Sequence, residues 1–123
     1  MHAYQPSRLV VASLRAEDVP AVAHFYRDVI GLRLMPGHGQ WPAFALENGV
    51  HLVIVQGQMS ASRDEGAARF PVIALSVPDL DEAVERLQVH GVELPWGGES
   101  NQGAEWVMFY DPAGNLIELA QLS

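Results

Sequence analysis

Few side chains in this sequence could bind a metal or transfer a proton. The chain contains no cysteine, which excludes disulfides, thiolate zinc sites and a cysteine nucleophile. Four of its five histidines fall on a terminus, in a loop or in expected helices, and we interpret them as surface residues: His2, His24, His38 and His90. The fifth, His51, falls in a segment of strand character, as does Glu118 near the end of the chain. These two residues are therefore the candidate groups for chemistry.

Two common functional arrangements have no support in the residue spacing. Ser13 and Ser76 have no neighbour that can be assigned as a base, so a serine nucleophile cannot be defended. The glycine-rich stretches 37–39 and 97–98 lack the strand-to-helix context and the lysine of a phosphate-binding loop. We interpret these two stretches as flexible loops at the mouth of a cavity.

Composition narrows the class of protein and of partner. With 123 residues, 49% apolar and 18% charged, the chain should fold as one compact domain or as two small modules that share a core. The net charge is -8 and the sequence contains no lysine, which argues against a surface for nucleic acid or for an anionic membrane. The same charge would favour a cationic small-molecule ligand.

The sequence carries no sign of membrane insertion or export. No apolar run approaches the roughly 18 residues that a transmembrane helix needs. Residues 1–7 lack the apolar core of a signal peptide. We therefore expect a cytoplasmic protein with no membrane partner.

One pattern of secondary structure is expected twice along the chain. In the first half we expect a strand, a helix and three further strands, over residues 9–14, 18–30, 32–35, 41–46 and 50–55. In the second half we expect the same order, over residues 71–77, 79–90, 92–94, 104–110 and 115–120. Asp18 and Asp79 can cap the helices, because a carboxylate there accepts a bond from an otherwise unpaired N–H. Gly31 and Gly91 can end them in a left-handed conformation.

Neither half is expected to fold by itself, because each would leave one apolar sheet face uncovered. The alternative is an accidental repeat within an ordinary α+β domain, but the shared order of cap, helix, glycine and glycine-turned hairpin favours a duplication. We therefore expect a single domain over residues 1–123, built from modules at approximately 8–56 and 70–121. Residues 57–69 are polar and small and are expected to form the linker.

Two stretches carry a family resemblance. Residues 25–32 read Phe-Tyr-Arg-Asp-Val-Ile-Gly-Leu, and residues 109–119 read Phe-Tyr-Asp-Pro-Ala-Gly-Asn-Leu-Ile-Glu-Leu. With the repeat, the chain from Arg8 to Ala120 resembles the vicinal-oxygen-chelate superfamily, which includes glyoxalases, bleomycin resistance proteins and extradiol dioxygenases. The resemblance implies an α+β fold of two βαβββ modules that form a curved sheet around a cavity. It also implies a homodimer, often with modules paired across chains.

The metal ligands of this superfamily are mostly replaced here. Metal-dependent members usually carry histidines at the positions of Val11 and Val72, and a glutamate at that of Glu118. The fourth position falls on Val53 by the repeat; His51 lies two residues earlier, on the same strand face, and would be a ligand only after a two-residue slip. Valine has no lone pair to offer, and divalent catalytic sites generally need three or more N or O ligands. We therefore expect no bound metal and no other cofactor.

The resemblance leaves two functions open. The first is a metal-free protein that binds a small molecule, sequestering a cationic or aromatic ligand in an acidic, aromatic-lined cleft of a dimer. The second is an enzyme: a lyase, isomerase or dioxygenase that uses Glu118 in an atypical metal site or as an acid/base group. The fold supports many chemistries and cannot choose between them.

The residues expected around the ligand lie at positions that the resemblance places on the cavity wall: Glu118, His51, Val11, Val53, Val72 and Trp106. Glu118 shares a strand face with Leu116 and Ala120. In the functional interpretation, its carboxylate points into the cavity. The alternative is a glutamate that pairs with a neighbour or faces solvent, and His51 could equally be a polar strand residue. The aromatic residues could line the cavity as a stacking surface or belong to the core: Trp41, Trp96, Trp106 and Tyr110.

Overall fold

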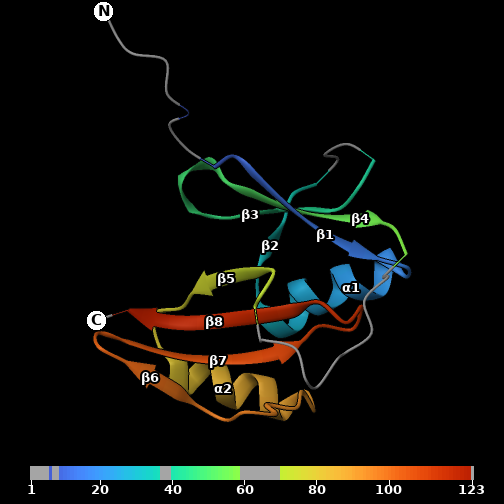
Figure 1. The fold of residues 1–123 in the computed structure, drawn as a ribbon. Coiled ribbons are helices and arrows are strands. Elements are labelled where there is room, and N and C mark those ends of the chain that lie inside the picture. Colours follow the sequence, from blue (N-terminus) through green and yellow to red (C-terminus); the bar gives the residue numbers. More distant parts are fainter. Residues whose placement is uncertain (1–5, 7–8, 37–39, 59–69, 123) are drawn as a thin grey trace, which may run out of the picture.

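The computed structural model describes residue 6 and residues 9–36, 40–58 and 70–122, and it shows two modules of the same design (Figure 1). The first module consists of β1 (Val11–Ala16), α1 (Val19–Phe25), the π-helical segment η1 (Tyr26–Ile30), β2 (Arg33–Leu34), β3 (Ala43–Ala45), the short helix η2 (Glu47–Gly49) and β4 (His51–Gln56). The second consists of β5 (Ile73–Ser76), α2 (Leu80–Val89), β6 (Glu99–Asn101), β7 (Ala104–Tyr110) and β8 (Leu116–Leu122). In the described ranges no helix is long and apolar enough to cross a bilayer.

Each module forms one four-stranded mixed sheet. Sheet A has the order β1-β4-β3-β2 and sheet B has the equivalent order β5-β8-β7-β6. In each sheet the first and last strands of the module pair in parallel, and the other pairs are antiparallel. The predicted α+β fold of two βαβββ modules is confirmed, and the two sheets remain open instead of closing into a barrel.

The caps and turns lie where the sequence predicts them. The Asp18 carboxylate accepts a bond from the backbone N–H of Ala21 at 3.1 Å, and Asp79 accepts one from Glu82 at 3.2 Å. Gly31 ends the first helical segment with a φ of 91°, a left-handed conformation that glycine tolerates without steric cost. These local interactions explain why the repeat is readable in the sequence.

The strand predictions need two corrections. The first strand begins two residues later than expected, at Val11. The strand expected at 92–94 does not form; the second strand of the second module is β6, at Glu99–Asn101. Val92 and Leu94 lie between α2 and β6 and instead pack against the hydrophobic core. The apolar residues therefore alternate as in a strand, although the segment pairs with no described strand. Most of the expected linker 57–69 lies outside the described residues, as does the stretch 37–39.

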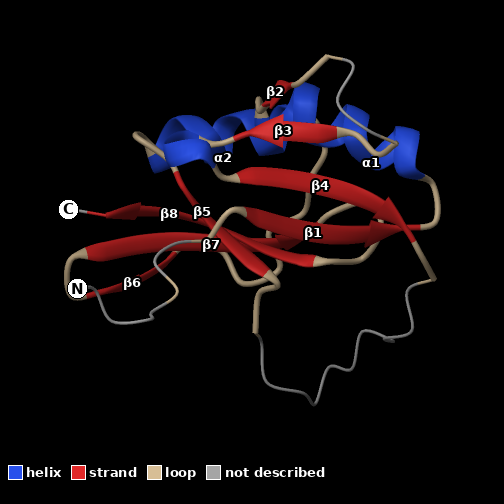
Figure 2. Ribbon diagram, turned by 90° about the horizontal axis from the view of Figure 1, so that it is seen from above, coloured by secondary structure: helices blue, strands red, loops and turns tan. Residues whose placement is uncertain are grey.

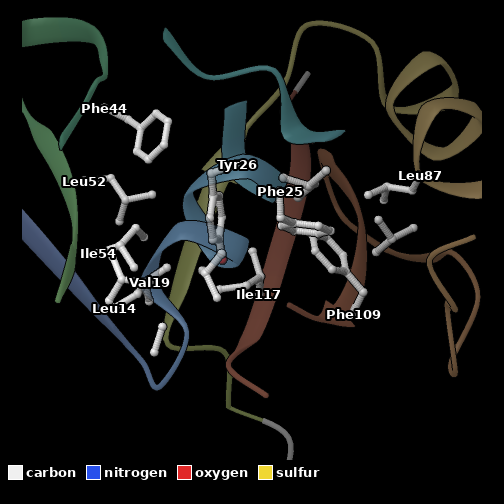
Figure 3. Close-up of a cluster of buried hydrophobic side chains, with 14 of the residues drawn as sticks. Leu14, Val19, Phe25, Tyr26, Phe44, Leu52, Ile54, Leu87, Phe109 and Ile117 are labelled. Atoms are coloured by element: carbon white, nitrogen blue, oxygen red, sulfur yellow. The ribbon is translucent and has the colours of Figure 1, made fainter. Parts of the chain in front are cut away.

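The hydrophobic core is shared by both modules and centres on the first helix (Figure 3). Phe25 and Tyr26 meet edge to face, with ring centroids 5.3 Å apart. Tyr26 then contacts Phe44 of sheet A at 6.3 Å, whereas Phe25 contacts Phe109 of sheet B at 6.2 Å. Two adjacent aromatic residues therefore join the cores of the two modules.

A buried polar network crosses the same junction. Asp111, in the turn between β7 and β8, is only 2% exposed. Its carboxylate accepts bonds from the Tyr26 hydroxyl at 2.7 Å, from the Asn115 side chain at 3.0 Å, and from the backbone N–H groups of Ala113 and Asn115. The Asn115 amide also donates to the carbonyl of Arg15 in β1, at 3.0 Å. The turn of the second module is thus bonded to two elements of the first.

The Tyr26 hydroxyl can act only as a donor to this carboxylate. Burial is the main cause that raises the pKa of Tyr26 far above its ordinary value, and the charge of Asp111 and the hydrogen bond to it raise the pKa further. The phenol therefore stays protonated, and Asp111 keeps a donor in a region that water does not reach.

Replacing Tyr26 with phenylalanine should destabilise the domain by about 1.5–3 kcal/mol, because it removes a hydrogen bond to a buried charged group and leaves one acceptor position of Asp111 without its donor. Urea denaturation followed by circular dichroism measures the change. Ser13→Ala is the matched control, since it removes an exposed hydroxyl and should shift stability by no more than about 0.5 kcal/mol.

The free energy of unfolding at alkaline pH distinguishes the effect of the Tyr26 hydroxyl from general packing effects. Above about pH 10 an unfolded tyrosine loses its proton while folded Tyr26 keeps it, so the wild-type free energy of unfolding should fall by about 1.4 kcal/mol per pH unit on account of Tyr26. Tyr26→Phe should lack that part of the slope. The chain contains no lysine, so few other groups titrate there. Equal stability and equal slopes in the two proteins would contradict the role given to Tyr26.

Candidate functional site

Each sheet has one face packed against a helix and one face turned away from it. In β4, Leu52 and Ile54 are fully buried on the helix face, whereas His51, Val53 and Val55 on the opposite face are half-buried. Figure 2 shows the helices gathered along one side of the molecule. The faces away from the helices are called open face A and open face B, after their sheets, and they are the surfaces that remain available to a ligand or a second chain.

Open face A carries three of the predicted site residues. Val11 pairs with His51 across β1 and β4, and His51 pairs with Ala45 across β4 and β3. Val53 lies two residues further along β4 and pairs with Ala43, so it points the same way. The ladder therefore brings Val11, His51 and Val53 together on one surface.

Open face B carries the other three. Glu118 is half-buried and pairs with Ala74 of β5 on one side and Met108 of β7 on the other. Trp106 is two residues from Met108 on the same face. Val72 precedes β5, and its backbone N–H donates to the carbonyl of Leu116, which continues the same register. Ile117 and Leu119 take the opposite, buried face of β8.

Aromatic side chains border this carboxylate. Tyr110 lies on open face B by alternation from Trp106, and its ring centroid is 5.9 Å from that of Trp96 in the loop before β6. Trp41 instead packs against the hydrophobic core and so belongs to the core, which is the alternative to lining the cavity. Open face B therefore combines a carboxylate with aromatic surface, while a stacking role for Trp96, Trp106 and Tyr110 stays a prediction.

Three charged residues on the open faces were not among the site residues predicted from the sequence. Arg33 in β2 pairs with Ala45 and so shares open face A with His51. Arg15 in β1 pairs with Val55 on the same face. Glu99 in β6 pairs with Trp106 on open face B. Alternation in β1 could have placed Arg15, but β2 has two residues and β6 three, so their register was not readable from the sequence.

The donor groups do not fit the metal site of the metal-dependent relatives. At the four positions where the family resemblance places ligands, this chain has Val11, Val53, Val72 and Glu118, hence one carboxylate and three side chains with no lone pair. His51 sits beside Val11 in the ladder, but on the sheet that does not carry Glu118. Over the described ranges, no three His, Asp or Glu side chains are grouped so that they could hold a metal ion. No step of chemistry through a metal is therefore assigned.

Comparison with known proteins yields one family and many similar folds. The family model of the Glyoxalase/Bleomycin resistance protein/Dioxygenase superfamily matches residues 8–119. No curated protein sequence matches the chain significantly.

Three solved structures illustrate the range of similar proteins. TnmS3, an antibiotic binding protein from Streptomyces sp. CB03234, is 29% identical with a TM-score of 0.76, over 98% of this chain and 100% of its own. Lactoylglutathione lyase from Agrobacterium tumefaciens is 25% identical with a TM-score of 0.71, over 95% of each chain. A glyoxalase/dioxygenase from Nostoc punctiforme, 21% identical with a TM-score of 0.78 over 100% of this chain and 98% of its own, shows the fold alone.

The donor set predicts the metal content of the protein. Protein purified without chelator should contain well below one equivalent of Zn, Ni, Mn or Fe per chain by mass spectrometry of the elements, because Glu118 and His51 together give at most two donors. His24→Ala is the control for adventitious binding, since His24 and Asp28 form an exposed pair at 3.0 Å. Stoichiometric metal that survives His24→Ala and disappears in Glu118→Gln would contradict the prediction.

Proposed function

The chain belongs to the glyoxalase/bleomycin resistance protein/dioxygenase superfamily, and on that premise we propose that it binds a small molecule without metal-dependent chemistry. The observation that carries the proposal is the set of residues at the ligand positions: three valines and Glu118, all on the open sheet faces. A glutamate beside aromatic residues can still bind a ligand. The three valines cannot coordinate a metal, so a bound ligand could not be activated by a metal ion at these positions.

The similar structures support the binding class. One of them is an antibiotic binding protein, and its likeness to this chain extends over nearly the full length of both. Another is a lactoylglutathione lyase. The second likeness does not favour a lyase here, because such chemistry in this superfamily is expected to need the histidines that Val11 and Val72 replace.

The proposed ligand is cationic or aromatic. A half-buried carboxylate such as Glu118 favours a positively charged group, and charge-assisted hydrogen bonds contribute about 1.5–3 kcal/mol each. Aromatic rings attract cations over their faces and stack on planar ligands. Trp106 shares open face B with Glu118, and Trp96 with Tyr110 forms a second aromatic surface nearby.

We propose that the binding protein is a homodimer whose cleft lies between open face A of one protomer and open face B of its partner. Both β1 and β5 are edge strands, so each presents a row of unpaired backbone groups. Large apolar residues next to these edges are exposed: Leu9 at 64%, Val10 at 51%, Phe70 at 79% and Val72 at 56%. Pairing of the edges across two chains would satisfy the backbone groups and cover this apolar surface.

Light scattering should give about twice the mass of one chain at micromolar concentration, and Val10→Glu should shift the protein toward monomer by placing a charge at the β1 edge. Val89→Glu is the matched control, because Val89 is also an exposed valine, at 76%, and lies on α2, away from both edge strands. A wild-type protein that remains monomeric, or a dimer unaffected by Val10→Glu, would contradict this assembly.

Replacing Glu118 with glutamine should weaken ligand binding by about one to two orders of magnitude, because the amide keeps the shape of the side chain but removes its charge. Thermal-shift screening of cationic and aromatic metabolites and antibiotics identifies the ligand, since binding raises the apparent stability. Calorimetry then compares affinities. Glu105→Gln is the matched control, being an exposed glutamate on the opposite face of sheet B. Equal affinities in all three proteins would place the site elsewhere.

A further inference from the structure

The ionisable residues of the strands are separated by sign between the two sheets. The strands of sheet A contain three such residues, all basic: Arg15, Arg33 and His51. The strands of sheet B contain three carboxylates, Glu99, Glu105 and Glu118, besides the phenol of Tyr110, and no basic residue. The whole chain carries only seven arginines and no lysine against fifteen acidic residues. A sheet whose ionisable residues are all basic is therefore unexpected in this protein.

The register places all three basic residues of sheet A on the same side. Arg33 pairs with Ala45, and Ala45 pairs with His51, so these residues form one row across three strands. Arg15 pairs with Val55 and also lies on open face A. It stands four residues from Val11, about 13 Å further along the strand, and thus outside this row.

Arg33 differs from two other arginines, Arg27 and Arg86, which are bonded to groups of the protein itself. Arg27 binds the Asp28 carboxylate at 3.0 Å. Arg86 donates to the backbone carbonyls of Val29 and Asp28, at 2.7 and 2.9 Å. Arg33 is exposed, and within the described part of the chain it makes no hydrogen bond or ion pair. Its five guanidinium N–H donors therefore stay available, in a geometry that matches a carboxylate or phosphate.

Ala45 leaves room for an anion between Arg33 and His51. The two residues are two strands apart, hence about 10 Å between their Cα atoms. The alanine between them projects only a methyl group. The long arginine side chain can reach over this methyl toward the imidazole of His51, which lies on the other side. The guanidinium can therefore hold one anionic group above Ala45, beside the His51 ring.

We propose that Arg33, with His51, forms an anion-binding subsite on open face A, so that the ligand carries a carboxylate, phosphate or sulfate in addition to its cationic group. The location of the subsite rests on the proposed function, in which open face A lines one wall of the ligand cleft and Glu118 lies on the other. The ligand is then an amphoteric molecule, with its anion toward Arg33 and its cation toward Glu118.

Three probes with one ring system test the subsite separately from the cation site: indole-3-propionate carries only the anion, tryptamine only the cation, and tryptophan both. Their affinities are measured by NMR titration of the labelled full-length protein, with the Arg33 side-chain N–H as reporter. Arg33→Gln should weaken indole-3-propionate and tryptophan about tenfold and leave tryptamine unchanged. Arg27→Gln, which removes the same charge from an arginine paired with Asp28, should change none of the three.

The outcomes distinguish this inference from the proposed function. If indole-3-propionate leaves the Arg33 resonance unmoved at millimolar concentration, or binds equally well to Arg33→Gln, the anion subsite is refuted. If Arg33→Gln alters the monomer–dimer equilibrium in sedimentation but not the affinity for the anion, Arg33 serves contact between chains, and the inference is overturned. If Arg33→Gln behaves as expected while Glu118→Gln leaves tryptamine binding unchanged, the subsite stands and the cation contact of the proposed function fails.

Discussion

The hydrogen bond from Tyr26 to Asp111 is the interaction on which the arrangement of the two modules depends. Its partners are 85 residues apart in the chain and meet at 2.7 Å in the interior. A buried carboxylate is costly unless its acceptor positions are paired, so Asp111 favours the one docking of the modules that supplies Tyr26. Arg86, which lies in the same module as Asp111, strengthens this junction, because it binds the carbonyls of Asp28 and Val29 near the end of η1.

This docking decides which surfaces are left for function. The first helix lies between the cores of both modules, with Phe25 against one sheet and Tyr26 against the other. The helix faces of both sheets are therefore used in folding, and the open faces are not. A residue on an open face can change without a change in the core, and Val11 is indeed 47% exposed. The fold can thus accommodate valine at positions where the family resemblance implies a metal-binding histidine.

Charge on the open faces gives the protein its proposed specificity. Glu118 lies on one face, and Arg33 and His51 lie on the other. Neither group is needed to fill the core, whereas Arg86 and Asp111 are tied to the packing of the modules. In a strongly acidic chain, an arginine on a sheet face that has no carboxylate partner among the described residues is better suited to an external anion than to stability, because exposed ion pairs add little.

The sequence by itself determined the features that depend on near neighbours. These features are the duplication, the capping roles of Asp18 and Asp79, and the alternation that puts Glu118 and Ile117 on opposite faces of one strand. Each depends on residues close together in the chain, so each could be predicted without the fold. Only the tertiary structure decided the short strands β2 and β6, the row that joins Arg33 to His51, and the bond from Tyr26 to Asp111. These depend on strand register and module docking, which are set by contacts between distant parts of the chain.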